Sequence, residues 1–308
     1  MSARSNRRSR AIEPLIFFLS LLIDGALAGA LYALIALAFV LVYKSSRMVN
    51  FALGEWIMTG ATLAAVGQNA IGLGLAAAIV LAAAGMAVFG IAFNAIIVRR
   101  LLTRPVISLI MVTIGLGAMM RGTGALVFAG IPGGLQLPVL VESLIVRGVP
   151  IPPEKLIAAI VAAIIIALVT WFYQRSRSGV GLRAIADDPQ AAAAAGIDVR
   201  RLLALLWGVT GVISVAAGIL WIFAAGVGFG VALVGLKIFP IVIIGGLDSL
   251  PGTIVAAMLI GVAESLGAGY LDPQLGGGFG TIASYLLMMA MLMVRPYGLF
   301  GQAPSERV

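Results

Sequence analysis

Long apolar runs separated by short basic breaks constrain this chain more than any other feature. Nine runs occur, at 12–43, 49–68, 71–98, 105–129, 156–174, 202–225, 231–246, 252–270 and 279–294. A helix needs about 20 mostly apolar residues to cross a bilayer, and most of these runs approach or exceed that length. Lipid admits only spans that satisfy their own backbone hydrogen bonds, and the runs lack the alternation of a β-barrel strand. The sequence therefore predicts an all-α polytopic membrane protein with about eight or nine transmembrane helices, some of them broken.

Composition excludes most other classes. Of the 308 residues, 62% are hydrophobic and only 10% are charged, whereas about 25% are charged in a soluble domain. The net charge of +8 comes mainly from short tracts beside the apolar runs, as the positive-inside rule expects, so we predict no nucleic-acid partner. The chain has no cysteine and no histidine, which excludes disulfides, Cys/His metal sites and histidine-based triads. We expect no catalytic residues, since neither a phosphate-binding loop nor a G-x-S-x-G elbow occurs in the sequence.

The arginine bias orients the runs. The breaks at 99–104 and 175–201 carry many of the arginines and are expected on the cytoplasmic side. The Gly- and Pro-rich stretch 130–154 is then an ordered loop on the outer face, and the chain from Arg295 onward lies inside.

The N-terminal end does not fit this orientation simply. A single crossing by 12–43 would leave the basic N-terminal tail outside, against the charge rule. Either 12–22 is a separate partial or interfacial segment, or the region around 44–60 does not cross fully. We divide the chain into an uncleaved basic tail (1–11), one transmembrane domain (12–294) and a C-terminal tail (295–308).

Small residues are frequent in the apolar runs. Gly25-x-x-x-Gly29 is one example among many Gly and Ala pairs with this spacing. Such pairs let helices approach closely in lipid. Together they predict a tightly packed bundle.

A polar interruption lies between the first two apolar runs, at Lys44–Glu55. A carboxylate inside a membrane is costly and is by default a candidate functional group. Asn50, Gly54 and Glu55 could form a helix break beside a passage. Alternatively, Glu55 pairs with Lys44 or Arg47 at a helix end and only fixes packing. Both interpretations remain open at this point.

A second interruption, rich in Gly and Pro, occurs at Ile244–Gly252. Two broken regions in corresponding halves of a chain are a pointer to a transport pathway. The candidate residues of the substrate path are Asn50, Phe51, Gly54, Glu55, Gly245 and Gly246.

The loop 175–201 is the longest polar segment and predicts a short helix of its own. Asp188 is placed to cap that helix, Pro189 fits its first turn, and Gly196 can end it. The alanine-rich helix has no large apolar face to bury within this protein, so it suits a cleft on another one. A solvated connecting helix is the alternative.

Several motifs together resemble one known family. They are GALYALIALA at 29–38, VNFALGE at 49–55, GLRAIADDPQAAAAAGI at 181–197, GLKIFP at 235–240, IGGLDSLPG at 244–252, Glu264, and RPYGLFG at 295–301. In this order and spacing, the chain resembles LivH-type permease subunits of the ATP-binding-cassette (ABC) importers for branched-chain amino acids. The resemblance covers almost the whole chain.

The resemblance implies a five-component importer in a bacterial inner membrane. A second permease chain, two ATPase chains and a periplasmic or lipid-anchored binding protein would be the partners. This chain would not be an enzyme and would hold no cofactor, with ATP and Mg on the ATPases. The cytoplasmic coupling loop would dock into the ATPase through Arg183, Asp187, Asp188, Pro189, Ala192, Gly196 and Ile197.

The substrate and the transport class have alternatives. Leu53 stands where the family usually has histidine, and Asp248 where it usually has glycine. Branched-chain or other hydrophobic amino acids are our first prediction, and urea, amides, or aromatic and other organic acids are the alternative. An ion-coupled secondary transporter would instead use Glu55, Glu264 or Asp24 as its titrating carboxylate, and a channel would form a symmetric homo-oligomer.

Overall fold

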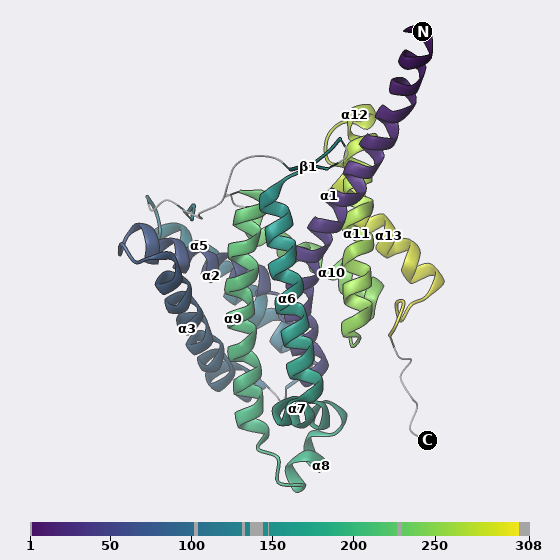
Figure 1. Ribbon diagram of the computed structural model, residues 1–308. Helices are drawn as coiled ribbons and strands as arrows, with labels where there is room; N and C mark the ends of the chain where they lie inside the picture. The colour runs from purple at the N-terminus through teal and green to yellow at the C-terminus, as the bar shows by residue number, and fades with distance from the viewer. Residues whose placement is uncertain are drawn as a thin grey trace.

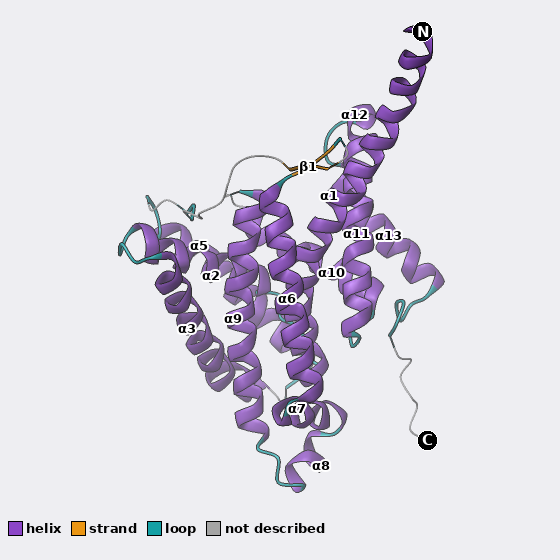
Figure 2. Ribbon diagram, viewed as in Figure 1, coloured by secondary structure: helices purple, strands orange, loops and turns teal. Residues whose placement is uncertain are grey.

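The computed structural model describes residues 2–101, 104–130, 133–135, 144–146, 148–226 and 230–301, and it is helical almost throughout (Figure 2). The first half contains α1 (Ser2–Ser46), α2 (Leu53–Asn69), α3 (Leu75–Phe93), a π-helical turn (Asn94–Val98), α4 (Arg99–Leu101) and α5 (Val106–Val127). The second half contains α6 (Pro153–Arg175), α7 (Arg177–Asp187), α8 (Pro189–Ala194), α9 (Val199–Ala225), α10 (Gly230–Gly245), α11 (Leu250–Tyr270), α12 (Asp272–Leu275) and α13 (Phe279–Val294). A short antiparallel hairpin, β1 (Leu144–Val146) with β2 (Val149–Ile151), lies between α5 and α6.

The prediction of an all-α polytopic protein is confirmed. In the described part of the chain, six segments are long and apolar enough to span a membrane: Pro14–Ser46, Leu75–Leu101, Ile107–Val127, Pro153–Arg175, Val199–Ala225 and Leu250–Tyr270. Two shorter apolar helices, Val234–Gly245 and Phe279–Val294, accompany them, and α2 has 17 residues. The predicted number of eight or nine transmembrane helices therefore agrees only approximately with these six long and two shorter apolar helices.

Helix α1 forms the centre of the bundle. All side chains from Leu31 to Val42 are buried, and a helix that is apolar and buried on every side belongs to a core. Its main neighbour is α11 (Figure 1). A Cβ added at Gly25 would lie 2.6 Å from the Val262 Cα, and one at Gly29 would lie 2.8 Å from the Met258 Cα. The Gly25-x-x-x-Gly29 pair therefore does what its spacing predicts and brings two backbones together.

A second packing centre joins α2, α3 and α9. Trp56, Phe93 and Trp207 form an aromatic cluster there, with ring centroids of Phe93 and Trp207 4.9 Å apart and those of Trp56 and Trp207 5.7 Å apart. The backbones also approach closely, since Gly90 faces the carbonyl of Trp207 and Gly60 faces Val215. Offset and edge-on aromatic contacts of this kind fix the relative rotation of the three helices.

The two ends of the bundle differ. Helices α7 and α8 lie at one end, while β1 and α12 lie at the other, close to where α1 emerges (Figure 1). The hairpin β1–β2 and the loop 175–201 thus lie at opposite ends of the bundle (Figure 1), as the charge pattern predicts. Residues 131–132, 136–143 and 147 of the outer loop lie outside the described residues.

Helix α1 decides one of the two N-terminal alternatives. The helix is continuous from Ser2 to Ser46, so the alternative in which 12–22 forms a separate segment is wrong. The N-terminus lies at the end opposite α7 and α8 (Figure 1). At the C-terminus, the Leu299 N–H donates to the Ile244 carbonyl at 2.7 Å, so 298–301 pack against the end of α10, and 302–308 lie outside the described residues.

Candidate functional site

The predicted path residues Phe51 and Glu55 line a cavity of about 430 Å³ between α2, α5 and α10. Glu55 is 5% exposed, and the Arg121 guanidinium on α5 donates a hydrogen bond to its carboxylate. The predicted alternative in which Glu55 pairs with Lys44 or Arg47 therefore names the wrong partner. Sequence reasoning missed Arg121, although an arginine inside the apolar run 105–129 is itself an intramembrane charge that could have marked it.

Glycines make room for this ion pair. A Cβ at Gly117, one helical turn before Arg121, would lie 3.1 Å from Glu55 Oε2. A Cβ at Gly235 would lie 2.7 Å from the Gly54 Cα. Gly54 is therefore a close-contact residue between α2 and α10, and this contact holds Glu55 at the wall of the cavity.

The segment before α2 is held by side chains. The Asn50 side chain accepts a hydrogen bond from the Ala52 N–H at 3.0 Å, which is an Asx turn that starts the helix. The Phe51 N–H donates to Thr113 Oγ1 at 3.3 Å, and the Phe51 ring stacks on Phe239 with centroids 4.8 Å apart. These contacts link the broken region to α5 and α10.

The wall contributed by α10 contains a proline. Pro240 lies inside the helix and has no N–H to donate to the Leu236 carbonyl one turn earlier. Leu236 lines the cavity beside Gly235. A helix interrupted beside a passage is a feature of transport proteins.

Gly245 and Gly246 lie elsewhere. A Cβ at Gly245 would lie 2.6 Å from backbone atoms of Gly252, and one at Gly246 would lie 2.5 Å from the Gly301 N. Neither lines the cavity at Glu55, so the structure does not bring the two interruptions together. Leu53, at the position where the resemblance expects histidine, is 1% exposed and packs in the core.

The short helix predicted in the loop 175–201 exists as α8. Asp188 Oδ1 accepts from the N–H groups of Gln190 and Ala191 at 2.8 and 3.0 Å, so it caps α8 as predicted. Gly196 ends the segment with a φ of 83°, in the left-handed region that favours glycine. Ala192 is buried, whereas Asp187 and Pro189 are exposed.

Arg183 has a partner within this chain. Its guanidinium donates to the Tyr173 carbonyl at the end of α6 and lies 5.8 Å from the centroid of the Tyr173 ring. The side chain is half-buried. Arg183 thus joins α7 to α6, and the exposed tip of α8 carries the accessible surface of the loop.

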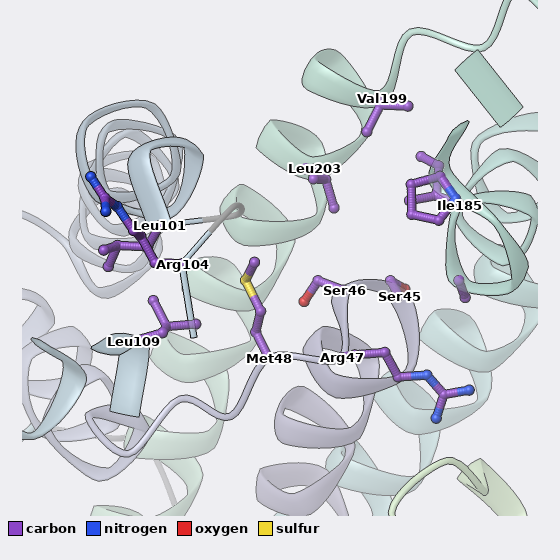
Figure 3. A pocket seen from close by; sticks show the side chains of 12 residues that line it. Ser45, Ser46, Arg47, Met48, Leu101, Arg104, Leu109, Ile185, Val199 and Leu203 are labelled. Carbon is purple, nitrogen blue, oxygen red and sulfur yellow. The ribbon is translucent and has the colours of Figure 1, made fainter. Parts of the chain in front are cut away.

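A second cavity, also of about 430 Å³, lies where the end of α1 meets α7 and the start of α9. Figure 3 shows Met48 extending toward Leu203, while Arg47 and Arg104 extend away from each other. The cavity wall is mainly apolar. Any movement of α7 and α8 relative to α1 would change its shape.

A third cavity, of about 300 Å³, lies on the other side of α10. Lys237 Nζ is 2.8 Å from Glu264 Oε2 and 2.9 Å from the Tyr32 hydroxyl, which itself donates to Glu264 at 2.6 Å. Nearer the end with β1, Lys155 Nζ is 2.6 Å from Asp24 Oδ1. Both ion pairs line this cavity.

Comparison with known proteins agrees with the sequence motifs. The family model described as "Branched-chain amino acid transport system / permease component" matches residues 21–295. The permease protein BraD of Pseudomonas aeruginosa is 27% identical, over 94% of this chain and 98% of its own length. LivH of Escherichia coli K12 is 28% identical over 96% and 99%, and the probable permease LivH of Methanocaldococcus jannaschii is 26% identical over 91% and 92%. The first two relatives are named as high-affinity branched-chain amino acid transport system permease proteins.

The match covers nearly the whole length of each of these relatives. The described part of the chain also contains six apolar helices that are long enough to cross a membrane. The chain is therefore a multi-pass inner-membrane protein. With the family model matching 21–295 and the motifs in order, the chain belongs to the branched-chain amino acid transport system permease family.

Proposed function

We propose that this chain is a permease subunit of an ATP-driven importer, and that it moves branched-chain or other hydrophobic amino acids across the inner membrane. Family membership supports the class, and the names of BraD and LivH support the substrate. The observation in the molecule that carries the proposal is the Glu55–Arg121 pair, because charges inside an apolar span mark a path or an interface. Family membership does not favour the ion-coupled alternative or a different solute.

The exposure of Arg121 supports a second permease chain as a partner. The Arg121 side chain is 52% exposed although it lies within the apolar span Ile107–Val127. An arginine this exposed cannot face lipid at low cost. We therefore assign the face of α5 that carries Gly117 and Arg121 to the contact with a second permease, so that the cavity at Glu55 opens between the two chains.

The energy source is assigned to partner ATPases that hold ATP and Mg. The tip formed by α7 and α8 projects from the bundle (Figure 1), and its exposed residues, including Asp187 and Pro189, are available for docking. Arg183 contributes to this surface indirectly, because its hydrogen bond to the Tyr173 carbonyl joins α7 to α6. An ATPase movement applied to α8 would reach the transmembrane helices through this connection.

The test is ATP hydrolysis by the complex reconstituted in lipid with its binding protein. The binding protein is loaded in turn with leucine, urea and benzoate. We expect leucine loading to stimulate hydrolysis several-fold and to drive leucine uptake, with no stimulation by the other two. Stimulation by urea or benzoate alone would refute the substrate, and a gently solubilised chain that retains no ATPase would refute the class.

A chemical cross-link tests the docking surface separately. The chain has no cysteine, so a single cysteine introduced for Ala193, exposed on α8, gives an unambiguous signal. We expect it to cross-link to the ATPase. A cysteine introduced for Leu168, which is 60% exposed on the apolar face of α6, serves as the control and should not.

A further inference from the structure

The cavity at Lys237 and Glu264 is separate from the cavity at Glu55, and α10 forms the wall between them. Gly235 and Leu236 line one cavity, and Lys237 lines the other. Adjacent helical residues differ by about 100° in direction, so one turn of α10 can border both spaces. The volume of about 300 Å³ is at the lower end of the range for ligand pockets, about 300–1,000 Å³, which suits a small molecule.

This cavity is lined by both positive and negative side chains, and some of their hydrogen-bond donors and acceptors are unused. An ammonium group has three donors, and Lys237 uses two of them, on Tyr32 and Glu264. Glu264 is 8% exposed, yet its Oε1 has no hydrogen-bond partner among the described residues. A buried carboxylate oxygen without a donor is costly. The Lys237–Glu264 pair therefore lacks at least one donor to the carboxylate.

The second ion pair extends the same pattern toward the outer end. Lys155 bonds Asp24, and both side chains are about one-third exposed, at 31% and 36%. Lys155 lies in the first turn of α6 (Pro153–Arg175), and α6 begins at the end of the bundle that carries β1 and α12 (Figure 1). A solute arriving from that side meets the Lys155–Asp24 pair first and the Lys237–Glu264 pair deeper in the cavity.

An apolar wall faces the charges. Trp221 stacks on Tyr32 with ring centroids 5.7 Å apart, and Leu31 and Ala224 continue the surface. A pocket with a few convergent polar groups and an otherwise apolar lining is the usual form of a small-molecule site. A ligand that matches has a carboxylate, an ammonium group and an apolar body.

We propose that this cavity binds an α-amino acid as its zwitterion, with the side chain against Trp221. The ligand ammonium donates to Glu264, and the ligand carboxylate accepts from Lys237. The inference rests on the proposed function and deepens it, since it places a solute-recognition site within the permease rather than on the binding protein alone.

The test is equilibrium binding to the purified permease–ATPase complex without its binding protein. Leucine is compared with leucinamide, which lacks the carboxylate, and with 4-methylpentanoate, which lacks the ammonium group. We expect saturable leucine binding, with each analogue at least about tenfold weaker. Equal binding of either analogue, or no saturable leucine binding at millimolar concentration, would overturn the proposal.

A paired substitution keeps the test independent of folding. Lys237→Met alone would leave Glu264 buried and uncompensated, so the informative variant is Lys237→Met with Glu264→Gln, which removes both charges. We expect this variant to elute as the intact complex and to lose leucine binding by at least about tenfold. The matched control is Arg201→Met with Asp198→Asn, which neutralises an exposed ion pair outside the cavity and should leave binding unchanged.

Transport separates this inference from the proposed function. If the paired variant keeps full leucine affinity while binding-protein-dependent leucine uptake proceeds in wild type, the cavity is not the site and the importer assignment stands. If wild type shows no ATP-driven leucine uptake at all, the proposed function itself fails.

Discussion

The pair formed by Glu55 and Arg121 gives the sharpest prediction. Arg121→Met leaves the Glu55 carboxylate, which is 5% exposed, without its cationic partner. Loss of one partner of a fully buried pair costs about 3–5 kcal/mol. Because Arg121 lines the cavity that opens between the two proposed permease chains, the pair is screened more than a fully buried one, and we expect a cost of about 1–3 kcal/mol.

This cost is measurable as thermal stability of the purified complex in detergent. At about 2–4 °C per kcal/mol, the apparent Tm of Arg121→Met should fall by about 2–12 °C. The double variant Glu55→Gln with Arg121→Met should recover most of that loss, because it removes the uncompensated charge. Uptake should fall in both variants, since both alter the cavity wall.

The control is Arg201→Met, which removes an arginine whose ion pair with Asp198 is exposed, with 89% of the arginine side chain accessible. It should change the apparent Tm by no more than about 1 °C, because exposed pairs contribute little. An Arg121→Met variant as stable as wild type, or a double variant less stable than the single one, would refute the argument that Arg121 compensates Glu55.

Two further predictions concern packing and coupling. Gly90→Leu places side-chain atoms against the Trp207 carbonyl, so α3 and α9 cannot approach each other as closely. We expect the yield of folded protein, measured as the monodisperse peak on size-exclusion chromatography, to fall sharply. Gly85→Leu on the same helix should give the wild-type yield, because an added Cβ there meets only the tip of Leu63 at 3.9 Å. Asp188→Ala removes the acceptor for two backbone N–H groups of α8 and weakens that helix by about 1 kcal/mol, so solute-stimulated ATPase activity should fall while Asp188→Asn keeps it. Undiminished stimulation in Asp188→Ala would show that α8 does not transmit the signal.

Helix content was predictable because lipid allows few alternatives. The apolar run 12–43 could only be a helix, and Gly25-x-x-x-Gly29 indicated its close contact face before the partner helix was known. The cap at Asp188 and the stop at Gly196 were also predictable, because both depend on residues within a few positions along the chain. Those local rules need no knowledge of the tertiary structure.

Pairing between distant residues was not predictable in this way. Glu55 lies eight residues from Arg47 and 66 from Arg121, and the structure selects Arg121 because Gly117 leaves space for the carboxylate beside α5. The hydrogen bond from the Arg183 guanidinium to the Tyr173 carbonyl was not predictable either, since it joins two different helices. The placement of Gly245 against Gly252 likewise depends on a contact that no local pattern contains.

The sequence alone determined that this chain is a membrane-embedded helical bundle with a long polar loop, since hydropathy, charge bias and local capping are properties of short segments. Only the tertiary structure decided which charges meet, that α10 separates two cavities, and that Lys237, Glu264 and Tyr32 form one network. Such arrangements depend on the rotation of each helix about its axis. Close packing of the whole bundle sets that rotation, and no single segment carries the information.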